Sequence, residues 1–324
     1  MPENADQIDT IINLHYSGLD PEIISFELDI DIDTVKKVIK NDLDRKKEKT
    51  MPIKFSQNKV YHSTIFDIDV IIKDSQVRIW NALKAKPEYE TSFKDTQNIL
   101  EKYGESKVNL IILHIDLVGS TRMSMIMPID RLTTIIRSFA QQMSIIISLF
   151  GGYVLKYIGD AVLAFFIVDD KQESSIYNLN EHKDENDIYN YIRCVKDSIH
   201  CAYTMIKVIQ EGINPILNQY DYPELNARIG IDFGEIAIVQ YGWDIDEYEK
   251  IVFRKPHFDL IGYTISMAVK MTTLAKTNHI VLGQKLFDLL NKKEQKGFKK
   301  LQTNPDIWNY TQKTTGKIYN LYST

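Results

Sequence analysis

The chain has 324 residues, of which 44% are hydrophobic and 26% are charged, and its net charge at pH 7 is −5. This composition is typical of a globular protein with a buried core and excludes a chain that is disordered throughout. The negative net charge gives no support to nucleic-acid binding over the whole surface. Since no apolar run reaches the length of a membrane span and the first residues are polar and acidic, we expect a cytoplasmic protein without membrane contact.

The first part of the chain predicts a small helical domain. Residues 8–40 show apolar positions at helical spacing with two interruptions, which indicates three short helices. The pattern resembles a helix-turn-helix domain, which we place at residues 1–48. The charged segment that follows, residues 49–106, is predicted to be a partly helical connector.

Charge leaves the partner of this small domain open. Residues 1–50 carry 7 Lys and Arg against 12 Asp and Glu, the opposite balance from the one that DNA binding favours. Lys36, Lys37 and Lys40 nevertheless cluster on the third predicted helix. Contact with DNA, contact with a protein and simple packing of three helices therefore all remain possible for residues 1–48.

From residue 107 onward, strands and helices alternate. Residues 108–117, "VNLIILHIDL", form a continuous apolar run, as in a central strand covered on both faces. An amphipathic helix follows, then a hairpin around Gly159-Asp160, a helix at 191–213, a second hairpin within 227–242 and a last helix after residue 262. This order predicts a ferredoxin-like βαββαβ domain at residues 107–324, so that the whole chain is α+β with a small all-α domain in front.

Four segments in this part resemble the catalytic domain of the class III adenylate and guanylate cyclases. They are "HIDLVGST", "LKYIGDAVLAFF", "RIGIDFGE" and "FDLIGYTISMAVKM", and they occur in the family's order within residues 107–322. The resemblance implies attack of the 3′-hydroxyl of a nucleoside triphosphate on its α-phosphorus, with pyrophosphate as the leaving group.

Two aspartates are the candidate metal ligands. A carboxylate that ends an apolar strand, as Asp116 does, is costly if it is buried alone, so a metal or a charged partner is expected. Asp160 follows Gly159 in a hairpin turn, where it is either a ligand or only a turn former. The resemblance implies that Asp116, Leu117 and Asp160 hold two Mg²⁺ or Mn²⁺ ions per site.

The phosphates and the base have their own candidate residues. By resemblance, Gly119, Ser120 and Thr121 direct backbone N–H groups toward phosphate oxygens. Lys156 lies on an otherwise apolar strand face, where a solvent-exposed role is not expected. The resemblance implies that Lys156 contacts the ring nitrogen N1 of adenine and that Asp259 accepts its exocyclic amine, although Asp259 can also be a helix N-cap.

The last motif departs from the family. Ser266 stands where the family has an asparagine that orients the ribose, and Lys270 stands where it has an arginine that contacts the transferring phosphate. Their spacing places both on one helix face. Because lysine lacks the fork of arginine, slow activity, another substrate or a degenerate site are all open. The family's C-terminal phosphate-binding lysine corresponds to Lys313 or Lys317.

The resemblance further implies a homodimer with two composite sites, in which the metal-binding aspartates and the base-binding residues come from different subunits. The aromatic segment 241–257 is either a dimer arm or a surface hairpin. The leading hypothesis is an adenylate cyclase that makes 3′,5′-cyclic AMP and pyrophosphate from ATP. The alternatives are a cyclase for another nucleoside triphosphate and a nucleotide-binding regulatory module that acts through residues 1–48.

Overall fold

The computed structural model describes residues 5–16, 20–49, 67–84, 93–168, 185–248, 251–312 and 315–324. The chain divides into two compact units, residues 1–65 and 66–324. None of the helices within these described ranges combines the length and apolar character needed to span a bilayer.

The N-terminal unit consists of helices in its described part, as the sequence predicts. Helix α1 covers Ala5–Tyr16, α2 covers Pro21–Leu28 and α3 covers Ile32–Lys49. Their apolar faces meet in a core that contains Ile11, Ile24, Val35, Val38 and Ile39. Lys36 on α3 forms an ion pair with Glu22 on α2 at 3.0 Å, so one member of the lysine cluster is engaged inside the unit.

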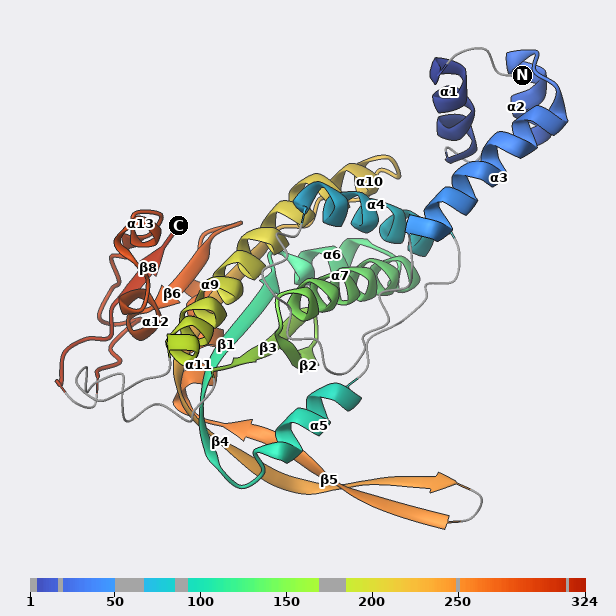
Figure 1. The fold of residues 1–324 in the computed structure, drawn as a ribbon. Coiled ribbons are helices and arrows are strands. Elements are labelled where there is room, and N and C mark those ends of the chain that lie inside the picture. The colour runs from blue at the N-terminus through green and yellow to red at the C-terminus, as the bar shows by residue number, and fades with distance from the viewer. Residues whose placement is uncertain are drawn as a thin grey trace. The chain divides into compact units, whose positions relative to one another are not determined.

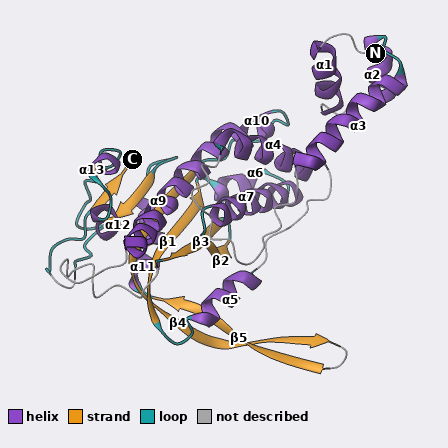
Figure 2. Ribbon diagram, viewed as in Figure 1, coloured by secondary structure: helices purple, strands orange, loops and turns teal. Residues whose placement is uncertain are grey.

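A single eight-stranded sheet forms the centre of the second unit (Figures 1 and 2). Its strands are β1 Lys107–Leu117, β2 Tyr153–Ile158, β3 Ala161–Ile167, β4 Ala227–Tyr248, β5 Ile251–Ile261, β6 Ile280–Gly283, β7 Lys299–Lys300 and β8 Leu321–Ser323. The sheet order is β2-β3-β1-β4-β6-β8-β7, and β5 pairs with β4. Within it, β1 pairs antiparallel with both β3 and β4, which is the order of the predicted ferredoxin-like unit.

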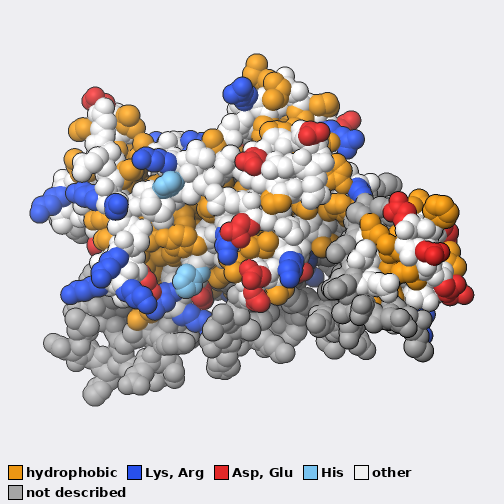
Figure 3. Space-filling model, turned by 90° about the horizontal axis from the view of Figure 1, so that it is seen from above, with side chains coloured by type: hydrophobic (Ala, Val, Ile, Leu, Met, Phe, Trp, Pro, Cys, Tyr) orange, Lys and Arg blue, Asp and Glu red, His pale blue; other side chains and the backbone are white. Residues whose placement is uncertain are grey.

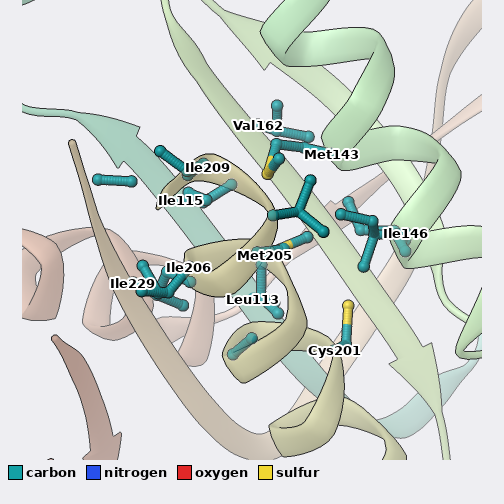
Figure 4. Close-up of a cluster of buried hydrophobic side chains, with 14 of the residues drawn as sticks. Leu113, Ile115, Met143, Ile146, Val162, Cys201, Met205, Ile206, Ile209 and Ile229 are labelled. Carbon is teal, nitrogen blue, oxygen red and sulfur yellow. The ribbon is translucent and has the colours of Figure 1, made fainter. Parts of the chain in front are cut away.

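Helices cover both faces of this sheet. They are α6 Ser120–Ile126, α7 Ile129–Leu149, α9 Glu185–Lys207, the π-helix η1 Val208–Ile213, α10 Asn214–Asn218, α11 Tyr263–Leu274, α12 Gln284–Asp288 and α13 Lys292–Gln295. Figure 4 shows the core on the α7 and α9 side, where Leu113 and Ile115 of β1 lie among Met143, Ile146 and Met205 of the helices. Because side chains alternate along a strand, His114 and Asp116 of β1 face the other side.

Helix α11 lies directly on β4 because two glycines leave room for it. A Cβ atom on Gly230 would lie 2.2 Å from the carbonyl oxygen of Ala268, and one on Gly234 would lie 2.5 Å from Oγ1 of Thr264. The prediction of a hairpin within 227–242 is therefore wrong: residues 227–248 form one strand. Its glycines serve close packing rather than a turn, and the hairpin joins β4 to β5 instead.

Two helices lie within the connector predicted at 49–106, as the prediction of a partly helical segment expects. Helices α4 Ile68–Lys84 and α5 Lys94–Lys102 belong to the second compact unit, whose boundary lies at residue 66 rather than 107. Helix α4 buries Ile71, Ile72 and Ile79 in the main core. It docks at the π-helix, where a Cβ on Gly212 would lie 2.1 Å from Oγ of Ser75. Of the helix predicted at 191–213, the part up to residue 207 is α-helical and residues 208–213 form the π-helix.

Surface charge is mixed on the face shown in Figure 3, where Lys and Arg side chains occur together with Asp and Glu side chains. The polar and acidic character of residues 169–190 predicts an exposed loop. Residues 169–184 lie outside the described residues, and residues 185–190 belong to α9.

One carboxyl group is fully buried beneath α11. Asp232 of β4 accepts a hydrogen bond from the hydroxyl of Tyr319 at 2.6 Å, and its other oxygen has no partner. Burial raises the pKa of Asp232 to about 7, against the opposing effects of Tyr319, a backbone N–H and Lys285. In the unfolded chain the pKa of an aspartate is about 3.9, so folding binds a proton here between about pH 4 and pH 7.

This carboxyl therefore stabilises the fold fully below about pH 4, and its contribution is lost as the pH rises through 7. The variant Asp232→Asn keeps an acceptor for Tyr319 and carries no charge. We expect it to be more stable than the unchanged chain at pH 8 by about 1 to 3 kcal/mol, with a smaller difference at pH 5. Urea unfolding at both pH values measures this, and equal pH dependence in the two proteins would contradict it.

Candidate active site

The carboxylate at the end of β1 has a charged partner. Asp116 accepts a hydrogen bond from Nη2 of Arg228 at 2.8 Å, and the β1–β4 register places the two residues directly opposite each other. Both side chains are about one quarter exposed, with 24% for Asp116 and 27% for Arg228. The ion pair satisfies the expectation that this carboxylate is not buried alone, and it leaves part of the carboxylate open to solvent.

Asp160 lies beside Asp116 in the turn between β2 and β3. The last pair of the β1–β3 register is Ile115 with Val162, so the antiparallel pairing brings the end of β1 to this turn. Gly159 has φ +63°, a left-handed conformation that glycine adopts without strain. Burial lowers the pKa of His114, and the neighbouring carboxylates of Asp116 and Asp160 oppose this shift, which places all three groups within electrostatic range.

The donor set at this corner fits a divalent cation that is bound together with a phosphate. Oδ2 of Asp160 is buried without a hydrogen-bond partner, an arrangement that is costly for a carboxylate unless a cation is near. Leu117 is the buried residue next to Asp116. The described residues contain no cluster of three or more His, Cys, Asp or Glu side chains that would bind a metal alone. Mg²⁺ is commonly held by one or two carboxylates plus substrate phosphates, and this corner offers that number.

The predicted phosphate-binding turn follows directly. Gly119 has φ +77° and precedes the first residue of α6, Ser120, while Thr121 is exposed. The N–H groups in the first turn of a helix have no acceptor within that helix, so those of α6 are available beside Asp116.

The two predicted base-binding residues lie together. Nζ of Lys156 on β2 is 2.5 Å from Oδ2 of Asp259 on β5. The Lys156 side chain is 42% exposed and that of Asp259 is 24% exposed. Oδ1 of Asp259 accepts from the backbone N–H of Leu260, which directs the carboxylate, while the N-cap position of α11 belongs to Gly262.

The two residues of α11 that differ from the family motif lie on its exposed side. Ser266 and Lys270 are exposed, whereas Met267, Ala268 and Met271 are buried against the sheet. Nζ of Lys270 lies 5.4 Å from the centre of the Tyr310 ring, a cation–π distance. Lys313 lies outside the described residues, and Lys317 is exposed.

Comparison with known proteins agrees with this geometry. A profile of the adenylate and guanylate cyclase catalytic domain matches residues 102–313. The chain belongs to this cyclase family. The match begins at Lys102, the last residue of α5.

Curated relatives of the cyclase domain are remote. A cytidylate cyclase from Escherichia coli is 22% identical over 200 residues, covering 61% of this chain and 39% of the relative. A second E. coli cytidylate cyclase is 26% identical over 56% of this chain and 35% of the relative. A uridylate cyclase from Rhodovulum sp. (strain MB263) is 24% identical over 63% of this chain and 74% of the relative. The chain thus spans less than two fifths of the length of each E. coli relative.

Solved structures similar to the cyclase domain include the guanylyl cyclase Cya2, with a TM-score of 0.47 and 16% identity over 68% of this chain and 93% of that one. The adenylyl cyclase CyaB from P. aeruginosa matches with a TM-score of 0.45 and 16% identity over 67% of this chain and 94% of that one.

Two residues beside the candidate metal ligands were not predicted from the sequence. Arg228 and His114 are close to Asp116 only because of strand pairing and side-chain alternation. The sequence signal for Arg228 was its place at the start of "RIGIDFGE". The rest of that segment consists of apolar residues, glycines and two acidic residues.

We expect Asp116→Asn and Asp160→Asn each to lower metal-dependent turnover by about 10³-fold or more while the chain stays folded. Asp160→Asn removes a carboxylate whose Oδ2 has no hydrogen-bond partner among the described residues, so its thermal stability should be unchanged or higher. Asp116→Asn leaves Arg228 without its anion and should lose stability. Turnover with Mn²⁺ together with thermal melts tests both, and an unchanged rate in either variant contradicts the role given to that aspartate.

Proposed function

We propose that the chain is a nucleotidyl cyclase whose substrate base presents an exocyclic amine beside a ring nitrogen that accepts a hydrogen bond, with ATP as the first candidate and CTP as the second. The reaction forms a bond between the 3′-oxygen and the α-phosphorus, breaks the bond to pyrophosphate and releases the hydroxyl proton. The products are a 3′,5′-cyclic nucleotide and pyrophosphate.

The observation that carries this proposal is the Lys156–Asp259 pair. A lysine ammonium only donates hydrogen bonds and an aspartate carboxylate only accepts them. Adenine and cytosine each present an amine beside a ring nitrogen that accepts, which matches this pair in polarity. Guanine and uracil present a carbonyl beside an N–H, which is the reverse, so their N–H would face the donor-only ammonium of Lys156 and their carbonyl the acceptor-only carboxylate of Asp259.

Cytosine is a candidate because two curated relatives are named cytidylate cyclases. Its amine and N3 repeat the hydrogen-bonding pattern of the adenine amine and N1, so polarity alone does not separate the two bases. The relative named uridylate cyclase would need the opposite polarity at this pair.

The residues around Asp116 divide the catalytic work. Asp116, Asp160 and the carbonyl of Leu117 would hold two Mg²⁺ or Mn²⁺ ions, which when bound acidify the 3′-hydroxyl and neutralise phosphate charge. Arg228 offers N–H donors beside Asp116 that can reach a phosphate oxygen. Gly119, Ser120 and Thr121 supply backbone N–H groups. Lys313 or Lys317 would contact a further phosphate.

The reacting groups are completed by α11. Ser266 would orient the ribose and Lys270 would stabilise charge on the transferring phosphate. We place these residues opposite the aspartates of a second subunit, in a homodimer with composite sites, which the β4–β5 ribbon with its exposed Tyr241, Trp243 and Ile245 would help to form. For the N-terminal helices we propose a regulatory contact with DNA or with a protein.

Incubating the purified chain with an equimolar mixture of ATP, CTP, GTP and UTP and Mn²⁺ tests the proposal. We expect 3′,5′-cyclic AMP or cyclic CMP to exceed the other two cyclic products by about 10²-fold, because only these bases match the pair. Product masses and chromatography identify the ring size and the base. Cyclic GMP or cyclic UMP as the main product would overturn the base assignment, and no cyclic nucleotide at all would overturn the function.

The composite site makes a separate prediction for Lys270. We expect Lys270→Ala to lower kcat by about 10² with little change in KM, since charge develops on the phosphate only in the transition state. Lys270→Arg should keep or raise activity because it offers two donors. Mixing inactive Asp116→Asn with inactive Lys270→Ala should restore about a quarter of the activity, because half of all dimers are mixed and each holds one intact site. No rescue, with subunit exchange verified, would place both residues in one subunit's site.

A further inference from the structure

The base-binding pair joins two strands that share no hydrogen bonds. Lys156 lies on β2, the edge strand at one end of the sheet order, and Asp259 lies on β5, which pairs only with β4. An ion pair this exposed contributes little to holding strands in place. The spacing of the two side chains must therefore be set by another element.

Helix α5 contacts both strands next to the pair. On the β2 side, the buried hydroxyl of Thr96 donates to the carbonyl oxygen of Val154 at 2.9 Å. The β2–β3 register shifts between Val154 and Lys156, so the strand is irregular at this point and does not fix the direction of Lys156 by pairing alone. The Thr96 hydrogen bond anchors the irregular segment two residues before the lysine.

The contact on the β5 side is reciprocal. Nε2 of Gln97 donates to the carbonyl oxygen of Phe258 at 3.1 Å, and Oε1 of Gln97 accepts from the N–H of Phe258 at 2.9 Å. One side chain thus satisfies both backbone groups of the residue before Asp259. The Phe258 ring packs on the backbone just after α5, where a Cβ on Gly104 would lie 2.8 Å from the ring.

An apolar cluster completes the bridge. Leu100 of α5 is fully buried among Leu155 of β2 and Phe258 and Leu260 of β5. The apolar contacts hold the helix on both strands, and the hydrogen bonds of Thr96 and Gln97 set the position of each strand along it.

We propose that α5 is a positioning element for base recognition, in which Thr96 and Gln97 hold Lys156 and Asp259 at the separation that one base requires. The inference rests on the proposed function, since it assigns a role to the base-binding pair. Neither residue touches the base. Their loss loosens the geometry of the pair and so weakens discrimination between bases, whereas Asp116, Asp160 and Lys270, which lie on other elements, keep their positions.

The test compares Gln97→Ala and Thr96→Val with the matched control Gln76→Ala. Gln76 also donates from a helix side chain to a backbone carbonyl, that of Glu211 at 2.9 Å, on the opposite face of the sheet. Equilibrium binding of 3′-deoxy-ATP, 3′-deoxy-CTP and 3′-deoxy-GTP with Mn²⁺ gives the ratio of affinities without any turnover, and kcat and KM for the ordinary triphosphates are measured beside it.

We expect the affinity ratio of the preferred amino base to guanine to fall about tenfold in Gln97→Ala, through KM rather than kcat, and to stay within about twofold in Gln76→Ala. Gln97→Glu keeps the acceptor and loses the donor, so its affinity ratio should lie between those of Gln97→Ala and Gln76→Ala. If Gln97→Ala does not fold, Gln97→Glu replaces it in the test. An unchanged ratio, or an equal loss for all bases, overturns the inference. Failure of the proposed function is distinguishable, because the unchanged chain would then form no cyclic product in the turnover assay.

Discussion

A carboxylate at the end of a buried strand needs a positive charge nearby, and the organisation of the cyclase domain depends on how Asp116 meets this need. The pairing of β1 with β4 over eleven residue pairs places Arg228 opposite it. Pairing of β1 with β3 on the other side brings in Asp160, whose buried Oδ2 has no hydrogen-bond partner among the described residues. Arg228 pairs with Asp116, and the negative charge of Asp160 is the source of the proposed affinity for divalent ions.

Strand β4 positions two groups of candidate site residues, one through the helix that packs on it and one through the strand that pairs with it. Gly230 and Gly234 allow α11 to approach the strand closely, so that its apolar side is buried and Ser266 and Lys270 are left on the exposed side. Beyond its pairing with β1, β4 continues and pairs with β5, which carries Asp259 toward Lys156. Helix α5 then spans β2 and β5. The candidate metal ligand Asp116 and the candidate base-binding residues Lys156 and Asp259 therefore lie on three different strands.

Sequence patterns predicted what depends on local periodicity. The central strand, the hairpin at Gly159-Asp160 and the buried stripe of α11 follow from hydrophobic spacing, and the family motifs indicated the cyclase fold. Contacts between distant segments were not predictable in this way. Arg228 meets Asp116 through strand register, α5 meets β5 through tertiary packing, and the glycines of β4 resemble turn residues until the helix that they accommodate is known. The docking of α4 on the main core was not predicted, because the charge of the connector hides the apolar stripe with which α4 packs.

The most direct test is a titration of the unchanged chain with Mn²⁺, followed by electron paramagnetic resonance, with and without a 3′-deoxynucleoside triphosphate that cannot cyclise. Because the chain supplies at this corner only the carboxylates of Asp116 and Asp160 among its described residues, we expect Mn²⁺ alone to bind weakly. Once the triphosphate is present, we expect binding at least about tenfold tighter that approaches two ions per site. Equally tight binding without the nucleotide, or no protein-bound Mn²⁺ in its presence, would contradict the proposal that Asp116 and Asp160 bind metal ions together with the triphosphate.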